Sequence, residues 1–236
     1  MRLPRWIAHR GGGALAPENT LAGIRLAAAM GFRAVEFDVM LSGDGTPVLI
    51  HDETLERTTN GHGRVCATDD RSLFALDAGQ GERIPTFGDA ARLCCELGLL
   101  TNVEIKPATG HERETAETVA RLAADIWRET PDQVLISSFV PEALDIALEL
   151  APTLPRGLLF ERVPPAWAGL FRSLRATTLH CHADHLDDQV LREAAALGVP
   201  IVCYTVNEEA LARRLIERGV SAMFTDRLDR FTEGAI

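Results

Sequence analysis

The chain has 236 residues, of which 46% are hydrophobic and 25% are charged, and this composition is typical of a globular protein with one sizeable core. Its formal net charge is -10 and its 24 Lys and Arg residues are scattered, which argues against nucleic acid as a partner. No segment approaches the roughly 18 consecutive apolar residues of a membrane span.

The cysteine pattern predicts a reducing environment. The five cysteines, none of them in a CxxC pair, are Cys66, Cys94, Cys95, Cys181 and Cys203. An odd number with one adjacent pair is poor material for a disulfide framework. The first residues lead directly into a strand-like segment and leave no room for an apolar signal segment. We therefore expect a cytoplasmic protein, either a monomer or an oligomer.

Short apolar segments alternate with amphipathic segments along the chain. The apolar segments predict strands at residues 6–10, 34–41, 101–107, 133–139, 156–161, 177–183, 200–207 and 221–226. The amphipathic segments predict helices at residues 19–31, 114–127, 141–151, 189–198 and 209–219. This alternation favours an α/β fold, a TIM (β/α)8 barrel formed by a single domain over residues 1–236. A doubly wound open sheet is the alternative, but polar residues that recur at successive strands are typical of a barrel mouth.

One connection is much longer than the others. Residues from about 42 to 85 separate the second strand from the helix that follows it, whereas a βα connection usually has about 2 to 6 residues. Within this insertion, GDGTPVLIH predicts a turn and a short strand, and NGHG is a turn sequence. We expect the insertion to form a small cap at the active-site end of the barrel.

Charged residues occupy alternate positions of two predicted strands. In VEFDV, Glu36 and Asp38 point to one side of the strand, and in VEIKP, Glu104 and Lys106 do the same. An ion-pair network that fills the barrel is one interpretation, but ionising four groups in a core without a task is costly. Glu36, Asp38 and Glu104 therefore predict an all-oxygen site that suits Mg²⁺ or Ca²⁺.

Two histidines lie at predicted strand ends. His9 ends the first strand, His51 ends the short strand of the insertion, and each is followed by a charged residue. A lone histidine in an apolar segment is more often a core or capping residue, but this matched pair favours general acid/base catalysis. Arg10 and Lys106 are candidates for binding an anion, and the glycines of RGGG would let the backbone approach a ligand.

Six motifs occur in this order along the chain: AHRGGGALAPENTLAG, EFDVMLSGDGTPVLIHDETLERTTNG, NVEIKP, SSF, YTVN and TDR. Together they closely resemble the glycerophosphodiester phosphodiesterase family, in particular its small cytosolic bacterial members. The resemblance implies a TIM barrel with a small insertion after the second strand and a divalent metal ion. It also implies hydrolysis of glycerophosphodiesters such as glycerophosphocholine and glycerophosphoethanolamine to glycerol 3-phosphate and an alcohol.

The resemblance further implies a role for each matching residue. The implied roles are acid/base catalysis by His9 and His51, metal binding by Glu36, Asp38 and Glu104, and phosphate binding by Arg10 and Lys106. In the family the nucleophile is thought to be the 2-hydroxyl of the glycerol, which gives a cyclic phosphate that water then opens. Tyr204 occupies a position where the family often has an aromatic residue, and it is a candidate for packing against the glycerol.

Three alternatives stay open. His180 and His182 form an H-x-H pair close to His185, which resembles the zinc-binding pattern of amidohydrolase-type enzymes; otherwise His180 would line the edge of the pocket. A lysophospholipase D-like enzyme would need an exposed apolar insertion, whereas HDETLERTTNGHGRVCATDDRS is polar. A binding module without turnover would lack a catalytic or ligand residue, and none is missing. We therefore favour hydrolysis of small, water-soluble glycerophosphodiesters.

Overall fold

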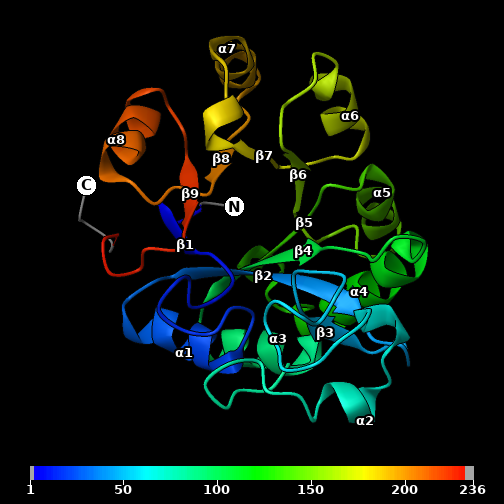
Figure 1. Cartoon of the computed structure of the whole chain (residues 1–236). Coiled ribbons are helices and arrows are strands. Elements are labelled where there is room, and N and C mark those ends of the chain that lie inside the picture. The colour runs from blue at the N-terminus through cyan, green and yellow to red at the C-terminus, as the bar shows by residue number, and fades with distance from the viewer. Residues whose placement is uncertain (1–2, 232–236) are drawn as a thin grey trace.

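Parallel strands close into a barrel at the centre of the computed structural model, which describes residues 3–231 (Figure 1). The strands are β1 (Trp6–Ala8), β2 (Ala34–Leu41), β3 (Pro47–Leu49), β4 (Leu100–Ile105), β5 (Val134–Ser138), β6 (Arg156–Phe160), β7 (Thr178–His182), β8 (Ile201–Tyr204) and β9 (Ala222–Thr225). Strand β1 pairs in parallel with both β2 and β9, and only β3 is antiparallel to its neighbour. The closure confirms the predicted TIM barrel and rules out the open, doubly wound sheet.

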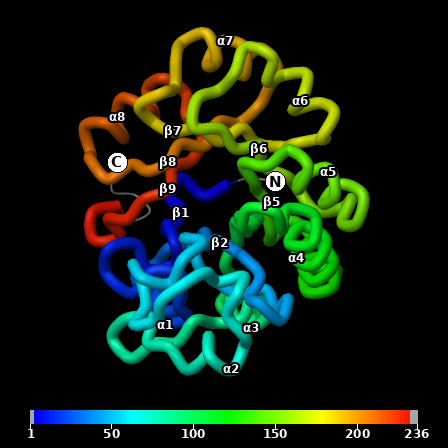
Figure 2. The backbone as a smooth tube through the Cα atoms, turned by 45° about the vertical axis from the view of Figure 1, so that its right-hand side comes forward, coloured from blue at the N-terminus to red at the C-terminus, as the bar shows by residue number. Residues whose placement is uncertain are grey.

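Helices surround the barrel, as Figures 1 and 2 show. The helices are α1 (Leu21–Ala29), α2 (Asp70–Leu73), α3 (Phe87–Leu97), α4 (Glu112–Ile126), α5 (Pro141–Leu150), α6 (Trp167–Ser173), α7 (Asp188–Leu197) and α8 (Glu209–Glu217), with 3₁₀ turns η1 (Val65–Ala67), η2 (Pro131–Gln133) and η3 (Ala183–His185). The sequence pattern does not predict α6, because its 7 residues are too few to show a helical period. Among the described residues, no helix has the length and apolar character needed to cross a bilayer.

The barrel interior changes from apolar to charged along the strands. The side chains of β2 that point into the barrel are Ala34, Glu36 and Asp38. Each is in register with an inward residue of β4, and Asp38 is paired with Glu104. A separate cluster of buried apolar residues also lies inside the barrel: Ile7, Ala34, Leu100, Val202, Ala222 and Phe224. Because parallel strands all run in one direction, their charged positions meet at one end of the barrel.

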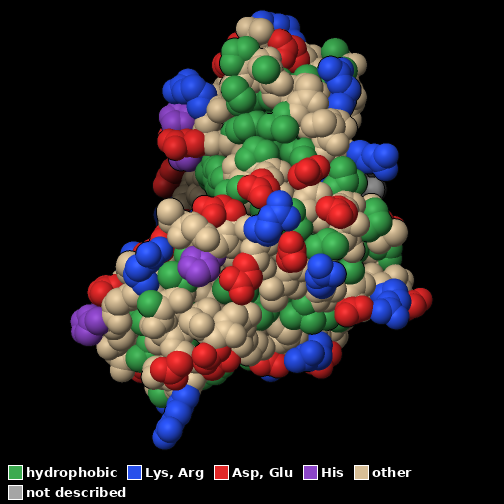
Figure 3. Space-filling model, turned by 90° about the vertical axis from the view of Figure 1, so that its right-hand side faces the viewer, with side chains coloured by type: hydrophobic (Ala, Val, Ile, Leu, Met, Phe, Trp, Pro, Cys, Tyr) green, Lys and Arg blue, Asp and Glu red, His purple; other side chains and the backbone are tan. Residues whose placement is uncertain are grey.

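The outer surface has a mixed charge. On the face drawn in Figure 3, Lys and Arg side chains are interspersed with Asp and Glu side chains rather than gathered in one area. Such a face has no strong field of one sign. This face therefore offers no broad positive area to an anionic ligand, whereas Arg10 and Lys106 place positive charge in a cavity.

The insertion after β2 packs both on itself and on the barrel. It begins with a turn and β3, which pairs with β2, and continues through η1 and α2 to the start of α3. In Figures 1 and 2 it lies beside α1 and α3. It packs in a second buried apolar cluster, to which β2 contributes Met40 and the segment after β4 contributes Ala108; the members from the insertion are Val48, Ile50, Leu55, Val65, Leu73, Ala78 and Ile84. Strand β3 therefore fixes the start of the insertion to the barrel, while this cluster packs the rest together.

The glycine run after β1 is required by close backbone contacts. Gly13 has a φ of +54°, its N–H donates to the carbonyl of His9 (2.9 Å), and a Cβ added to it would overlap the backbone of Asp226. Gly31 also has a positive φ, +86°, but a Cβ added there would meet nothing within 4 Å. A side chain would strain the backbone at both glycines, but only at Gly13 would it also clash with a neighbouring segment.

We expect Gly13→Ala to destabilise the protein by at least about 3 kcal/mol, because strain and overlap with the Asp226 backbone add together. Gly31→Ala is the matched control and should cost only about 1 kcal/mol, since it carries the strain alone. Urea unfolding of both variants measures the difference. Equal losses in the two variants would show that the close approach at Gly13 is unimportant.

Candidate active site

All the residues that the sequence predicts for the site line one cavity of about 160 Å³ at the carboxyl ends of the strands. The predicted residues in its lining are His9, Arg10, Glu36, Asp38, His51, Glu104, Lys106 and Tyr204. The other lining residues are Asn102, Phe139, Leu159, Thr205 and Phe224. The cavity thus has one strongly charged wall and one largely apolar wall.

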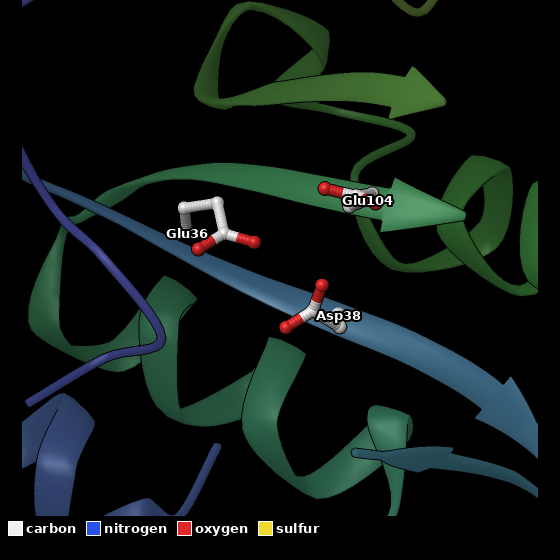
Figure 4. A group of neighbouring side chains, drawn as sticks. All are labelled: Glu36, Asp38 and Glu104. Atoms are coloured by element: carbon white, nitrogen blue, oxygen red, sulfur yellow. The ribbon is translucent and has the colours of Figure 1, made fainter. Parts of the chain in front are cut away.

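Three carboxylates of the charged wall lie close together on two neighbouring strands, β2 and β4 (Figure 4). One oxygen from each of Glu36, Asp38 and Glu104 lies within 4.8 Å of the others, and all three residues are at most 8% exposed. Burial and the neighbouring negative charge of Asp38 raise the pKa of Glu36 and raise the pKa of Glu104 to about 8. Burial also acts on Asp38, but Lys106 and the other nearby positive groups outweigh it and hold its pKa below the usual value.

This carboxylate group fits a divalent metal ion. Oε1 of Glu36 and Oε1 of Glu104 are buried and have no hydrogen-bond partner, although buried polar atoms are nearly always paired. Oxygen donors are the ligands that hard divalent cations prefer. A bound cation would satisfy both oxygens and offset the repulsion between the three carboxylates, so the group can bind a divalent metal.

His9 is oriented by a carboxylate from the opposite end of the chain. Its Nδ1 lies 2.7 Å from Oδ1 of Asp226, which follows β9, and its Nε2 lies 3.8 Å from Oε2 of Glu36. Asp226 is itself held by Asn207, whose Nδ2 donates to Oδ2 of Asp226 (3.0 Å). A histidine bonded through Nδ1 to a carboxylate presents Nε2 in a defined direction. Here that direction is toward the carboxylate of Glu36.

His51 has the same arrangement on the insertion. Its Nδ1 lies 2.6 Å from Oδ1 of Asp52, and its Nε2 lies 2.5 Å from Nζ of Lys106. Burial lowers the pKa of His51, and the charge of Lys106 lowers it further against the attraction of Asp38. His51 is therefore held largely neutral near pH 7, the form that can accept a proton.

Two cations flank the carboxylates from different loops. The backbone N–H of Arg10 donates to Oε2 of Glu36 (2.9 Å), and its Nε lies 3.8 Å from Oδ2 of Asp38. Nζ of Lys106 lies 3.4 Å from Oδ1 of Asp38 and 3.7 Å from Oε1 of Glu104. Arg10 and Lys106 thus bring positive charge to the cavity in which the carboxylates lie. An anion beside the carboxylates would meet both cations.

Tyr204 belongs to the apolar wall. Its hydroxyl donates to the carbonyl of Phe160 (2.9 Å), and its ring meets Phe139 edge to face at 5.8 Å between centroids. Phe139 is 39% exposed, which is unusual for a phenylalanine, because it stands at the cavity. With its hydroxyl already bonded, Tyr204 offers its ring rather than a proton to a ligand.

The histidines of β7 do not form a metal site. His180 is fully buried, its Nε2 lies 2.9 Å from Oγ1 of Thr178, and burial lowers its pKa to about 3. The expectation that His180 lines the pocket edge is wrong, because its place in the middle of β7 sets it too deep in the barrel. His182 and His185 lie together, with ring centroids 5.0 Å apart. Among the described residues, the only group with metal-site geometry is the three carboxylates.

Several residues with direct contacts to the site are absent from the sequence predictions. Asp226 and Asn207 orient His9, and Asn19 holds Asp38 by donating from Nδ2 to its Oδ2 (3.0 Å). Asn19 directly precedes Thr20, the N-cap of α1. Asp226 lies in the motif TDR, which carries no role by spacing alone. The positions of Asp226, directly after a strand, and Asn19, just before a helix, could have pointed to these residues. Their partners, however, lie elsewhere in the chain.

Comparisons with known proteins agree with this geometry. A model of the "Glycerophosphoryl diester phosphodiesterase family" matches residues 9–230. The chain is 34% identical over 229 residues to a glycerophosphodiester phosphodiesterase of Caldanaerobacter subterraneus subsp. tengcongensis, covering 93% of each chain. It is 39% identical to an Oleispira antarctica phosphodiesterase solved in complex with the product sn-glycerol-3-phosphate, with a TM-score of 0.88 and coverage of 95% and 93%. A Thermotoga maritima glycerophosphodiester phosphodiesterase is 26% identical, with a TM-score of 0.78 and coverage of 97% of both chains.

The raised pKa of Glu104 predicts how stability changes with pH. The pKa of Glu104 is about 8 in the folded protein, above the usual 4.5, so the folded state binds this proton more tightly than the unfolded state does. In the protein without metal, the resulting stabilisation is complete below about pH 4.5 and is lost as the pH rises through about 8. Thermal unfolding of chelated protein at about pH 6 and about pH 8 measures the loss. We expect Mg²⁺ or Ca²⁺ to raise the unfolding temperature more at the higher pH, because metal ions bind the ionised carboxylates.

Glu104→Gln is the control, because it keeps the shape of the side chain and removes the titration. This variant should lose part of the pH dependence. An unchanged pH profile in Glu104→Gln would contradict the assignment of the stability change to this carboxyl group.

Proposed function

The chain belongs to the glycerophosphoryl diester phosphodiesterase family of hydrolases, and we propose that its substrates are small, water-soluble glycerophosphodiesters such as glycerophosphocholine and glycerophosphoethanolamine. The products would be glycerol 3-phosphate and the free alcohol. The observation that carries the proposal is the meeting, in one cavity, of three carboxylates, two cations and two carboxylate-bonded histidines. The related Oleispira antarctica enzyme holds sn-glycerol-3-phosphate, which supports the same product here.

The proposal includes a divalent cation, Mg²⁺ or Ca²⁺, held by Glu36, Asp38 and Glu104. Their hard oxygen atoms suit either ion better than zinc, for which nitrogen and sulfur ligands are usual. When bound, the ion would supply Lewis-acid stabilisation of the charge that develops on the phosphoryl oxygens. The three buried carboxylates would then be ionised together, since the cation offsets their mutual repulsion.

Arg10 and Lys106 would bind and orient the phosphodiester. The phosphodiester carries one negative charge, and both side chains already reach the edge of the carboxylate group. Fixed cations in a partly buried cavity stabilise phosphoryl charge without reorganising during the reaction. The aromatic side chains of Tyr204 and Phe139 would provide an apolar contact for the glycerol.

The two histidines would transfer the protons of the reaction. One would remove a proton from the attacking hydroxyl, which in our proposal is the 2-hydroxyl of the glycerol, and the other would protonate the leaving alkoxide. A cyclic phosphate would form and water would open it in a second step. His9 and His51 each have Nδ1 bonded to a carboxylate, so Nε2 would be the atom that exchanges protons, and in His51 it would first part from Nζ of Lys106.

Two other functions have less support. A lysophospholipase D-like enzyme would expose apolar side chains to meet acyl chains, but among the described residues the exposed large hydrophobic side chains are Leu15, Leu97, Phe139 and Leu197, all outside the insertion. A zinc amidohydrolase would need His180, which is buried and bonded to Thr178. We also place the reaction in the cytoplasm, because all five cysteines are free thiols.

The activity is tested by measuring glycerol 3-phosphate released from glycerophosphocholine and glycerophosphoethanolamine after chelation, and again with Mg²⁺, Ca²⁺ or Zn²⁺ restored. We expect Mg²⁺ or Ca²⁺ to restore turnover, because the three carboxylates offer the oxygen ligands that these ions prefer. Lysophosphatidylcholine serves as the comparison substrate. Faster turnover of the lysolipid, or no release with any metal, would refute the proposed substrate class.

His9→Ala and His51→Ala should each lower kcat on the order of 10²- to 10⁴-fold, because each removes a proton-transfer group. His62→Ala is a matched control, since His62 lies on the same insertion as His51 with 87% of its side chain exposed. Thermal unfolding of all three variants checks that the fold is intact. Turnover close to wild type in either cavity variant would refute the acid/base role of that histidine.

A further inference from the structure

Arg57 joins two segments that both contribute to the active site. Its Nη1 and Nη2 lie 2.7 and 2.8 Å from the two carboxylate oxygens of Glu18, which precedes α1. Its Nε and Nη2 lie 2.5 and 3.0 Å from the two oxygens of Asp52, on the insertion. One planar guanidinium therefore forms paired hydrogen bonds with two carboxylates from different segments, a geometry that only arginine provides.

Each of these carboxylates also holds a residue of the site. Oδ1 of Asp52 lies 2.6 Å from Nδ1 of His51, and Oε1 of Glu18 accepts a hydrogen bond from Nη1 of Arg10 (2.9 Å). We call this series the Arg57 bridge: His51, Asp52, Arg57, Glu18 and Arg10. The bridge connects a proton-transfer residue to a phosphate-binding residue along the rim of the cavity.

The two ends of the Arg57 bridge meet again inside the cavity. Nε2 of His51 lies 2.5 Å from Nζ of Lys106, which lies 3.4 Å from Oδ1 of Asp38. Oδ2 of Asp38 in turn lies 3.8 Å from Nε of Arg10. The charged groups thus form a closed ring in which the bridge is the outer half and the metal-binding carboxylate Asp38 belongs to the inner half.

An ordinary surface ion pair would have little effect, but the Arg57 bridge differs from one. The carboxylates of Glu18 and Asp52 are only 21% and 28% exposed. Burial opposes ionisation of Glu18, yet its hydrogen bond with Arg57 and the charge of Arg10 hold its pKa below the usual value. The ion pair of Arg64 with Glu53, on the same insertion, is more exposed at 50% and 39%, and touches no residue of the cavity.

We propose that Arg57 is a positioning residue that sets the insertion against the loop before α1, so that His51 and Arg10 act on the same phosphoryl group. The proposal rests on the proposed function, because both end groups have roles in it. Strand β3, of 3 residues, ties the insertion to β2, and the apolar cluster of the insertion meets the barrel through Met40 and Ala108. Arg57 adds a direct link from Asp52, beside His51, to Glu18 in the loop before α1. A displacement of about 1 Å at a reacting group can cost on the order of 10²-fold in rate.

The test compares Arg57→Gln with Arg64→Gln in the metal-restored enzyme. Arg57→Gln should lower kcat/KM for glycerophosphocholine on the order of 10²-fold, with kcat reduced through His51 and KM raised through Arg10. Arg64→Gln should stay within about twofold of wild type. Activity of Arg57→Gln equal to that of Arg64→Gln would overturn the proposal.

Arg57→Lys separates the shape of the side chain from its charge. Lysine keeps the positive charge but cannot bind two carboxylates in paired fashion, so we expect it to remain at least about tenfold impaired. Full recovery in Arg57→Lys would overturn the proposal, since charge alone would then account for the effect. Lysine also keeps the two carboxylates neutralised, so this variant is informative if Arg57→Gln does not fold.

NMR of the side chains tests the Arg57 bridge independently of enzymatic activity. The imidazole signals of His51 and the Nε–H signal of Arg10 should both shift in Arg57→Gln and stay in place in Arg64→Gln, whether or not substrate is turned over. If wild type hydrolyses no glycerophosphodiester, the proposed function fails, and the shifts still decide whether the bridge exists. Unchanged signals for both His51 and Arg10 would overturn it.

Discussion

The burial of three carboxylates in one small group is the constraint on which the rest of the site depends. Glu36, Asp38 and Glu104 repel one another, and burial opposes the ionised form of each. Without positive charge nearby, such a group would protonate or destabilise the fold. Arg10 and Lys106 supply part of that charge, and one oxygen of each glutamate has no hydrogen bond, so both can accept a cation. The surrounding loops are arranged to keep these opposite charges together.

The apolar interior of the barrel stabilises the fold around the buried charged residues. A cluster of apolar side chains fills part of its interior, and the charged residues of β2 and β4 lie at the end of the barrel that faces the cavity. Period-two alternation directs Glu36 and Asp38 inward while their neighbours Val35 and Phe37 pack in the layer between strands and helices. Closure of the sheet through β1 then brings His9, after the first strand, beside Asp226, after the last.

The insertion is part of the site as well as its cover. It supplies His51 at the end of β3, and the short distance between His51 and Lys106 depends on how the insertion sits on the barrel. Its apolar cluster meets the barrel through Met40 of β2 and Ala108, which follows β4. Hydrogen bonds between the insertion and the rest of the protein restrict its orientation more strongly than apolar packing does, because hydrogen bonds are directional. The bonds of Arg57 to Glu18 and of Thr109 to Glu53 are of this kind.

The eight parallel strands and the charged residues of the cavity could be predicted from the sequence alone, whereas the short helix α6 could not. Alternation in VEFDV and VEIKP is a local property, because neighbouring side chains on a strand point to opposite sides whatever the fold. Tertiary structure decided which groups meet. The bond between His9 and Asp226 joins residues 217 positions apart, and that between Arg57 and Glu18 joins residues 39 apart. The depth of His180 likewise follows from the level at which β7 sits in the closed barrel. Local spacing carries no information about such contacts, since closure of the sheet and packing of the insertion set them.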